Sequence, residues 1–179
     1  MFTVAAVTSS RRIGLDPPTV AIVAGGIALG VTVVLFVVFA LGALEHSSRY
    51  VLAFGGIVIG GSMGASTLAG RRTQQSLVAR WDEVEGWLAL GAPPKIATID
   101  IARQAIREAL VPSLDQTKTT GLVTLPGAFV GAIFGGVSPL EAGRFQIVVL
   151  AGLMTAGAIS ASFVSLRLAP QLKRPVAER

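Results

Sequence analysis

Few side chains in this sequence could do chemistry, and they are scattered along the chain. The 179 residues include no cysteine and one histidine, His46, which follows Glu45. Without cysteine there is no thiolate to act as a nucleophile or a metal ligand. The sequence also lacks a Gly-Lys-Ser/Thr loop of the kind that cradles nucleotide phosphates. We therefore predict that the chain is not an enzyme and does not itself hydrolyse ATP.

A tight metal site would need histidine, carboxylate or thiolate ligands. The uncharged segments of the sequence offer only Met63, Met154, Gln146, hydroxyl groups and backbone carbonyls. His46, beside Glu45, is better explained as a solvated loop residue than as a metal ligand. We predict no metal site and no cofactor bound by this chain.

The elements that must position these residues are four stretches without Asp, Glu, Lys or Arg, at 17–44, 50–70, 119–140 and 145–166. About 20 apolar residues are enough for a helix to cross a bilayer. The chain is 52% hydrophobic and only 14% charged. We predict an all-α fold, a polytopic helical bundle forming one membrane domain over 1–179. Its four transmembrane helices lie at about 18–44, 50–70, 119–140 and 145–166, and a helical cytoplasmic loop covers 71–118.

The basic residues fall on alternate sides of these stretches. Only Arg49 and Arg144 lie on one side, while every other Lys and Arg lies on the opposite side. The positive-inside rule places the richer side in the cytoplasm. We therefore predict a multi-pass protein of the cell membrane (inner or plasma membrane), surrounded by membrane lipid, with both termini and the polar loop cytoplasmic. Basic residues at helix ends argue against a nucleic-acid partner.

Two of the stretches carry features that suggest how the helices associate. Gly56, Gly60 and Gly64 repeat at a spacing of four, which suits close helix packing. In the third stretch, Pro126 and Gly127 predict a break or kink, because proline removes a backbone donor and clashes with the preceding turn. Such a break can line a cavity, or it can only improve packing, and the sequence supports both equally.

The polar loop is predicted to fold as two short helices. The first covers 81–90 and ends in the Gly91-Ala92-Pro93-Pro94 turn, and the second covers 95–110 and is closed by Pro112. Glu85 and Gly91 are spaced as in the coupling loops of ABC permeases, whose rigid tip fits a groove on an ATPase. Arg103 and Arg107 lie one turn apart on the second helix, where charged residues are most often simply solvated.

Several longer segments carry a more specific likeness, namely 88–95, 103–112, 117–127 and 138–146. Together they resemble the FetB-type permease subunit of bacterial iron-export ABC transporters, to which plant aluminium-tolerance permeases are related. Family members are longer at the N-terminus, and this chain is expected to begin inside one of their membrane helices. Many members have Met after the Leu-Pro-Gly, where this chain has Ala128-Phe129.

The resemblance implies an ATPase partner that binds ATP, a homo-oligomer of the permease, and export of iron or another metal. A nucleotide-sugar or other solute is the alternative substrate. The alternative function is that of a non-transporting or regulatory fragment of such a permease. The ATPase-coupling residues are expected to be Glu85, Leu88, Gly91, Ala92, Lys95, Arg103 and Arg107. The translocation path is expected to include Gly121, Leu125, Pro126, Gly127, Gly131, Ser138, Pro139 and Gln146.

Overall fold

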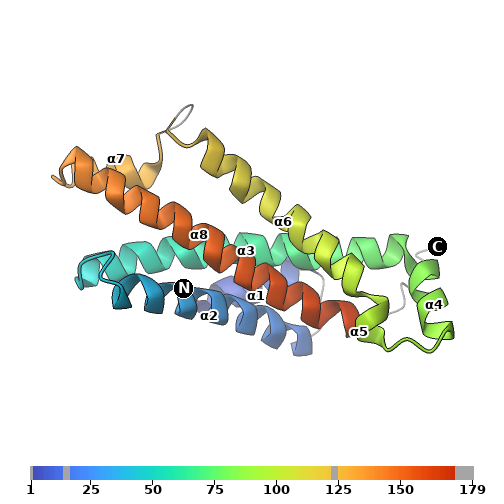
Figure 1. Cartoon of the computed structure of the whole chain (residues 1–179). Helices are drawn as coiled ribbons and strands as arrows, with labels where there is room; N and C mark the ends of the chain where they lie inside the picture. Colours follow the sequence, from blue (N-terminus) through green and yellow to red (C-terminus); the bar gives the residue numbers. More distant parts are fainter. Residues whose placement is uncertain (1, 14–16, 122–124, 172–179) are drawn as a thin grey trace.

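The computed structural model describes residues 2–13, 17–121 and 125–171. These residues form a helical bundle (Figure 1), so the prediction of an all-α membrane bundle is confirmed. In chain order the helices are α1 (Phe2–Ile13), α2 (Pro17–Ala40), α3 (Ser48–Ala79), α4 (Trp81–Ala89), α5 (Pro94–Ala97), α6 (Ile99–Thr119), α7 (Gly127–Phe134) and α8 (Pro139–Leu168), followed by a 3₁₀ turn, η1 (Ala169–Gln171).

Three of the described helices, α2, α3 and α8, are long and apolar enough to cross a membrane. Helix α8 is the central element and packs against both α2 and α3. Phe54 and Val58 of α3 join Ile27 of α2 and Val149 and Val164 of α8 in one buried cluster. Burial of these side chains against one another, rather than any charged contact, holds the three helices together.

Helices α2 and α8 approach each other closely because glycine lies at their contact. A Cβ added to Gly30 would lie 2.6 Å from the backbone oxygen of Ala156 and 2.5 Å from Ser160 Oγ. Ser160 Oγ also donates a hydrogen bond of 3.0 Å to the carbonyl of Gly26. Small residues at a membrane-helix contact allow such approach, and a hydroxyl–carbonyl bond then ties the two backbones together.

Helix α1 lies alongside α2 and α3. Its Ser9 hydroxyl is within hydrogen-bonding distance of Thr67 Oγ1, at 2.5 Å, and Arg71 Nε donates to the carbonyl of Arg12 at 2.7 Å. Ile13 packs over Gly70. These contacts fix α1 against the second half of α3.

The helices of the polar loop differ from the sequence prediction in three respects. Helix α3 continues to Ala79, past the predicted end of the second span at 70, because no helix-breaking residue follows Gly70 within it. The predicted helix 95–110 is divided at Thr98, whose backbone (φ −112°, ψ 0°) separates α5 from α6. Pro112 does not close α6, which continues through it to Thr119. A proline inside a helix costs one backbone hydrogen bond, and here the helix continues on both sides of that lost bond.

The prediction of a fourth span at 119–140 is not confirmed, because no single helix covers these residues. Gly121 has a left-handed backbone (φ +83°), which interrupts the helix after Thr119. Pro126 is extended (φ −65°, ψ 138°) and precedes α7, which has only 8 residues. The predicted break at Pro126 is present, since Leu125 and Pro126 are not helical and α7 begins at Gly127.

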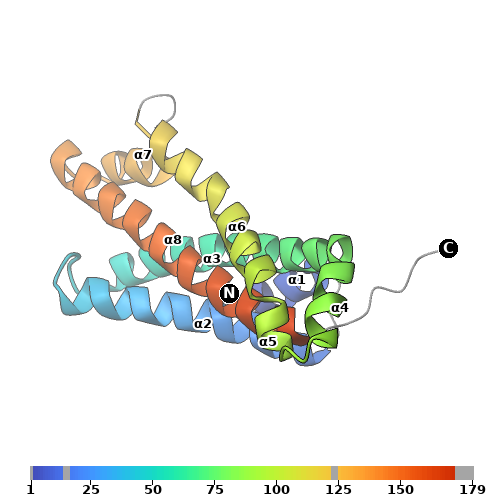
Figure 2. The same ribbon diagram turned by 45° about the vertical axis from the view of Figure 1, so that its right-hand side comes forward.

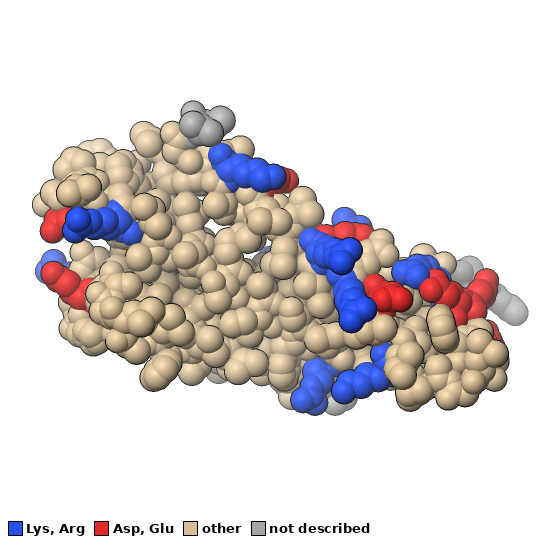
Figure 3. Space-filling model, viewed as in Figure 1, with Lys and Arg blue, Asp and Glu red and all other residues tan. Residues whose placement is uncertain are grey.

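The bundle has two ends with different chemistry. We call the end that holds the α2–α3 and α7–α8 turns the hairpin end, and the end that holds α4 and α5 the elbow end (Figures 1 and 2). Arg49 and Arg144 belong to the hairpin end. The other described Lys and Arg, apart from Lys118, belong to elements at the elbow end, where basic groups gather in the space-filling view (Figure 3).

Candidate functional site: the elbow and the path residues

The most clearly formed candidate site is the elbow, which we define as α4, the turn 90–93 and α5. Its turn is built by Gly91, whose backbone is left-handed (φ +84°), a conformation that glycine adopts without strain. The Gly91 N–H donates to the carbonyl of Leu88, and the Ala92 N–H to that of Trp87. These two bonds satisfy carbonyls at the end of α4 and make the turn rigid.

The elbow is anchored on one side by a small apolar cluster. Leu77 of α3, Val84 of α4, Ala97 of α5 and Ile101 of α6 are buried together, and Leu88 packs against them. Four elements therefore meet through these side chains. Leu88, predicted as a coupling residue, supports the elbow from within.

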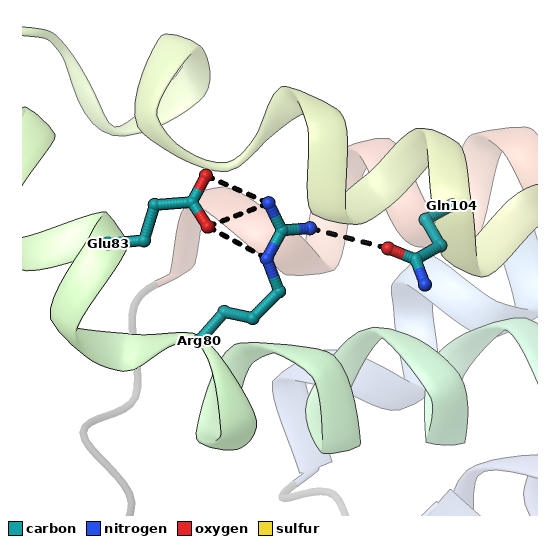
Figure 4. A network of polar contacts seen from close by, with 3 residues as sticks. All are labelled: Arg80, Glu83 and Gln104. Atoms are coloured by element: carbon teal, nitrogen blue, oxygen red, sulfur yellow. Dashed lines mark hydrogen bonds and ion pairs between the residues drawn. The ribbon is translucent and has the colours of Figure 1, made fainter.

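A polar network ties the elbow to the membrane helices. The Arg80 guanidinium, between α3 and α4, donates to both carboxylate oxygens of Glu83 at 2.8 Å and to Gln104 Oε1 of α6 at 3.3 Å (Figure 4). Gln104 Nε2 in turn donates to Glu108 at 3.0 Å, and Glu108 lies 3.4 Å from Arg72 Nε of α3. We call these five residues the Arg80 network. It joins α3, α4 and α6 through side chains.

The outward tip of the elbow is apolar and uncovered. Leu90 is 82% exposed, Ile96 57% and Trp87 47%. Glu85, Gly91 and Lys95 are exposed beside them, and Ala92 is half-buried. Three large apolar side chains in this position form a surface that a partner could cover.

Arg103 and Arg107 do not belong to this tip. Both are exposed on α6, and Arg103 pairs with Asp100 at 3.5 Å with 65% of its side chain exposed. Exposed pairs of this kind contribute little to stability. The contribution of these two residues to coupling stays a prediction.

The predicted path residues are spread over several elements. Gly121, Leu125 and Pro126 lie between α6 and α7, where the structure does not describe 122–124, and Gly127 is the first residue of α7. Ser138 and Pro139 begin α8, and the Ser138 hydroxyl both caps the Glu141 N–H and donates to its carboxylate. These two residues therefore have a clear structural role at a helix start.

Of the predicted path residues, only Gly131 lines the cavity at the hairpin end, which has a volume of about 500 Å³. Glu45, Ser47, Arg49 and Tyr50 give this cavity a polar rim. Its remaining lining residues are Ala53, Ile57, Ala128, Ala132, Gly135, Val137 and Phe145. Gln146 is buried in α8, and its Oε1 has no hydrogen-bond partner among the described residues.

The glycine stripe of α3 has no partner helix among the residues that the structure describes. A Cβ added to Gly56, Gly60 or Gly64 would meet no atom within 4 Å. The glycines that do pack against neighbouring helices include Gly30, Gly61 and Gly152. Close packing at the predicted stripe thus stays a prediction, and it requires a helix from outside the described chain.

Sequence reasoning missed the Arg80 network. The spacings of Arg80 to Glu83 and of Gln104 to Glu108 were readable signals, since residues three and four apart are neighbours on a helix. The bond from Arg80 to Gln104 joins positions 24 residues apart. Only the packing of α3 against α6 brings those two side chains together.

Comparisons with known proteins agree with this membrane architecture. The uncharacterised protein family UPF0014 matches residues 1–172. The UPF0014 membrane protein STAR2 of Oryza sativa subsp. japonica is 37% identical over 160 residues, covering 89% of this chain and 56% of the rice protein. Protein ALUMINUM SENSITIVE 3 of Arabidopsis thaliana is 33% identical, covering 89% of this chain and 59% of the plant protein.

One bacterial relative is named for transport. The probable iron export permease protein FetB of Escherichia coli strain K12 is 34% identical over 134 residues, covering 75% of this chain and 52% of FetB. The chain spans about half the length of the curated relatives it matches. No solved structure matches it. The resemblance to FetB-type permeases is confirmed, and with a family match over residues 1–172 the protein belongs to the UPF0014 family.

Proposed function

We propose that this chain is the membrane permease subunit of an ABC transporter, coupled to a separate ATPase subunit through the elbow. The observation that carries this proposal is the uncovered tip of Trp87, Leu90 and Ile96 on a rigid turn beyond the apolar spans. A protein surface that is apolar, exposed and rigidly supported is suited to a partner groove. ATP would bind to the partner.

The proposed coupling follows from how the elbow is attached. Its connection to α3 is direct, and the Arg80 network and the Leu77–Val84–Ala97–Ile101 cluster join it to α6. Movement of an ATPase groove would therefore displace α3 and α6 together rather than bend a flexible loop. Rigid-body displacement of packed elements is a common route for such transitions.

Iron or another metal ion is the substrate that we favour, because a relative is named as a probable iron export permease. The described residues hold no group of three or more His, Asp or Glu side chains that could bind a metal. The metal would thus be cargo in transit. A nucleotide-sugar or other solute is the alternative cargo.

The orientation that we propose follows the distribution of basic residues, with the elbow and both termini in the cytoplasm. We also propose a homo-oligomer, with Gly56, Gly60 and Gly64 of α3 as the exposed helix face available for contact. A second candidate function is a non-transporting subunit that regulates a longer permease.

Leu90→Asp tests the proposed coupling site. A carboxylate in an apolar groove is costly to desolvate, so capture of the ATPase subunit should fall by about tenfold or more. Co-purification and permease-stimulated ATP hydrolysis measure this effect, with iron efflux from vesicles as the transport readout. Leu140→Asp is the matched control, because Leu140 is 68% exposed at the opposite end of the bundle.

Wild-type capture and stimulation by Leu90→Asp would remove the argument for the elbow as the ATPase site. If the unsubstituted protein stimulates ATP hydrolysis but does not export iron, the transported substrate would be another solute. A chain that binds a longer permease and adds no transport of its own would support the regulatory function instead.

A further inference from the structure

A cavity at the elbow end is lined by positive charge without negative charge. It has a volume of about 350 Å³ and lies where α5, the start of α6 and the end of α8 meet. Figures 1 and 2 both show α5 beside that end of α8. Its charged lining residues are Lys95 of α5 and Arg167 of α8, and no described Asp or Glu lines it. The volume lies within the range of small-molecule sites, so the cavity is large enough for an anionic group.

Neither of these two cations has a carboxylate partner among the described residues. The ion pairs that the structure describes are formed by other basic residues, namely Arg72, Arg80, Arg103 and Lys118. Asp100 follows the lining residue Ile99 in the sequence, but it does not line the cavity and it pairs with Arg103. Two like charges that share a cavity repel each other, and an anion bound between them offsets that repulsion.

The guanidinium of Arg167 is oriented by an aromatic ring one turn earlier on α8. Its Cζ atom lies 5.4 Å from the centre of the Phe163 ring. That ring packs in turn on α2, where it lies 3.4 Å from a Cβ built at Gly25. A guanidinium that stacks on a ring by its face keeps the N–H donors of its edge available. Such an edge matches the paired oxygens of a phosphate group.

The rest of the cavity lining offers little polar chemistry. The hydroxyl of Thr98 already donates a hydrogen bond of 2.8 Å to the carbonyl of Pro94. The other lining residues are apolar, namely Ile99, Ala102, Leu166, Ala169 and Pro170. An inorganic anion would contact the two cations and leave this apolar wall uncovered. A phosphate ester with an apolar chain matches both parts of the lining, because the chain covers the wall.

The cavity lies at the level where α8 leaves the membrane. Arg167 directly follows the uncharged stretch 145–166. Lys95 is at a similar level, since α5 contacts η1, which follows α8. Basic side chains next to the end of a span lie among the lipid headgroups. Basic pockets between membrane helices at this level bind anionic lipid headgroups.

From these observations we propose that the cavity binds the phosphate group of an anionic phospholipid from the leaflet at the elbow end. Lys95 and Arg167 contact the phosphate, and the apolar wall at Ile99 and Leu166 contacts the glycerol and acyl region. The bound lipid joins α5 of the elbow to the end of α8, two elements that the Arg80 network does not connect. This inference goes beyond the proposed function and needs no ATPase subunit.

Lipid titration of the full chain tests the proposal. The chain is purified in detergent, depleted of lipid and titrated calorimetrically with dioctanoyl phosphatidylglycerol, dioctanoyl phosphatidylcholine or inorganic phosphate. Phosphatidylglycerol should bind about tenfold more tightly than phosphatidylcholine, because only its headgroup carries a net negative charge. Inorganic phosphate at the same concentration should not displace it. Displacement by inorganic phosphate as effective as by phosphatidylglycerol would overturn the lipid and indicate a site for soluble phosphate.

A pair of double variants separates the cavity from the overall charge of the elbow end. Lys95→Gln with Arg167→Gln should weaken phosphatidylglycerol binding by about tenfold or more. Arg103→Gln with Arg107→Gln is the matched control, because it removes the same charge from exposed positions of α6 that do not line the cavity. The control should keep the starting affinity. An equal loss in both double variants, or equal binding of the two lipids by the unsubstituted chain, would overturn the proposal.

Folding and coupling are controlled separately. The apparent Tm of each variant without added lipid shows whether it folds. If the double variant does not fold, Lys95→Glu replaces it, since Lys95 is exposed and the substitution reverses one charge of the cavity. Unchanged phosphatidylglycerol binding by Lys95→Glu would contradict the site. Lys95 is also a predicted coupling residue, but the titration contains no ATPase subunit, so its result is independent of the outcome for Leu90→Asp.

Discussion

At the scale of single residues, Arg80 has the most connections of any described side chain outside the apolar core. It ends α3, precedes α4 and bonds to α6. Its two-pronged contact with Glu83 fixes the guanidinium plane, which leaves one N–H directed at Gln104. Fork-shaped contacts of arginine with carboxylates add geometric specificity to their energy. Arg80 therefore contributes more to the orientation of the elbow than to the stability of the fold.

Arg80→Ala should loosen the elbow without unfolding the bundle. Because the Arg80–Glu83 ion pair is partly exposed, Arg80→Ala should lower the free energy of unfolding by about 1 kcal/mol or less. Thermal unfolding in detergent measures this change. The distance distribution between spin labels at Glu85→Cys and Arg107→Cys should broaden at the same time. Val78→Ala, an exposed position on the same turn of α3, is the control and should leave that distribution narrow. An unchanged distribution in Arg80→Ala would show that the apolar cluster alone holds the elbow.

At the scale of the helices, glycines at helix contacts and glycines on open helix faces have different roles. Gly30 allows α2 to touch the backbone of α8, whereas a Cβ added at Gly60 of α3 meets no atom of the described residues within 4 Å. A methyl group added at a closed helix contact forces the helices apart. The same methyl on an open helix face removes only the conformational freedom of glycine, which favours the helix.

Gly30→Ala should therefore destabilise the fold by about 1–3 kcal/mol through overpacking, while Gly60→Ala should leave stability within about 1 kcal/mol of the starting protein. Both are measured as apparent Tm in the same detergent. If Gly60 also contacts a helix of a second copy, Gly60→Leu should lower the oligomer fraction in size-exclusion chromatography with no loss of Tm. Equal destabilisation by Gly30→Ala and Gly60→Ala would contradict the helix contacts described above.

At the scale of the whole molecule, the two ends of the bundle should face opposite sides of the membrane. Arg49 and Arg144 are the basic residues at the hairpin end, and the elbow end carries the majority. Retention of positive loops in the cytoplasm fixes orientation during insertion. Lys118 is the exception, because α6 carries it away from the elbow end.

Cysteines at the two ends of α3 test this orientation. Gln75→Cys should react only with reagents that enter the cytoplasm, and Ser48→Cys should react in intact cells with impermeant reagents. Both native side chains are exposed, so access to the sulfur is comparable. Labelling of Gln75→Cys from outside intact cells would reverse the orientation.

The sequence by itself determined the helical membrane class, the place of α2, the C-terminal end of α8 and the α4–Gly91 turn, whereas α8 begins at Pro139 and not at the predicted 145. Each depends on local physics, namely the transfer of an uncharged segment into lipid and the backbone freedom of glycine and proline. It also located the break at Pro126. The prediction of a span at 119–140 assumed that an uncharged stretch must form one helix. Gly121 and Pro126 both disfavour a continuous helix through this stretch.

The tertiary structure decided the path of α6, the glycines that pack and the partners of Arg80. The contact of Ala109 with Ala161 and the bond from Arg80 to Gln104 depend on how helices rotate and cross. Rotation and crossing are set by the summed fit of many side chains over three helices, which no single segment of the sequence contains. For that reason the packing of α6 against α3 and α8 could not be predicted from the sequence of the polar loop.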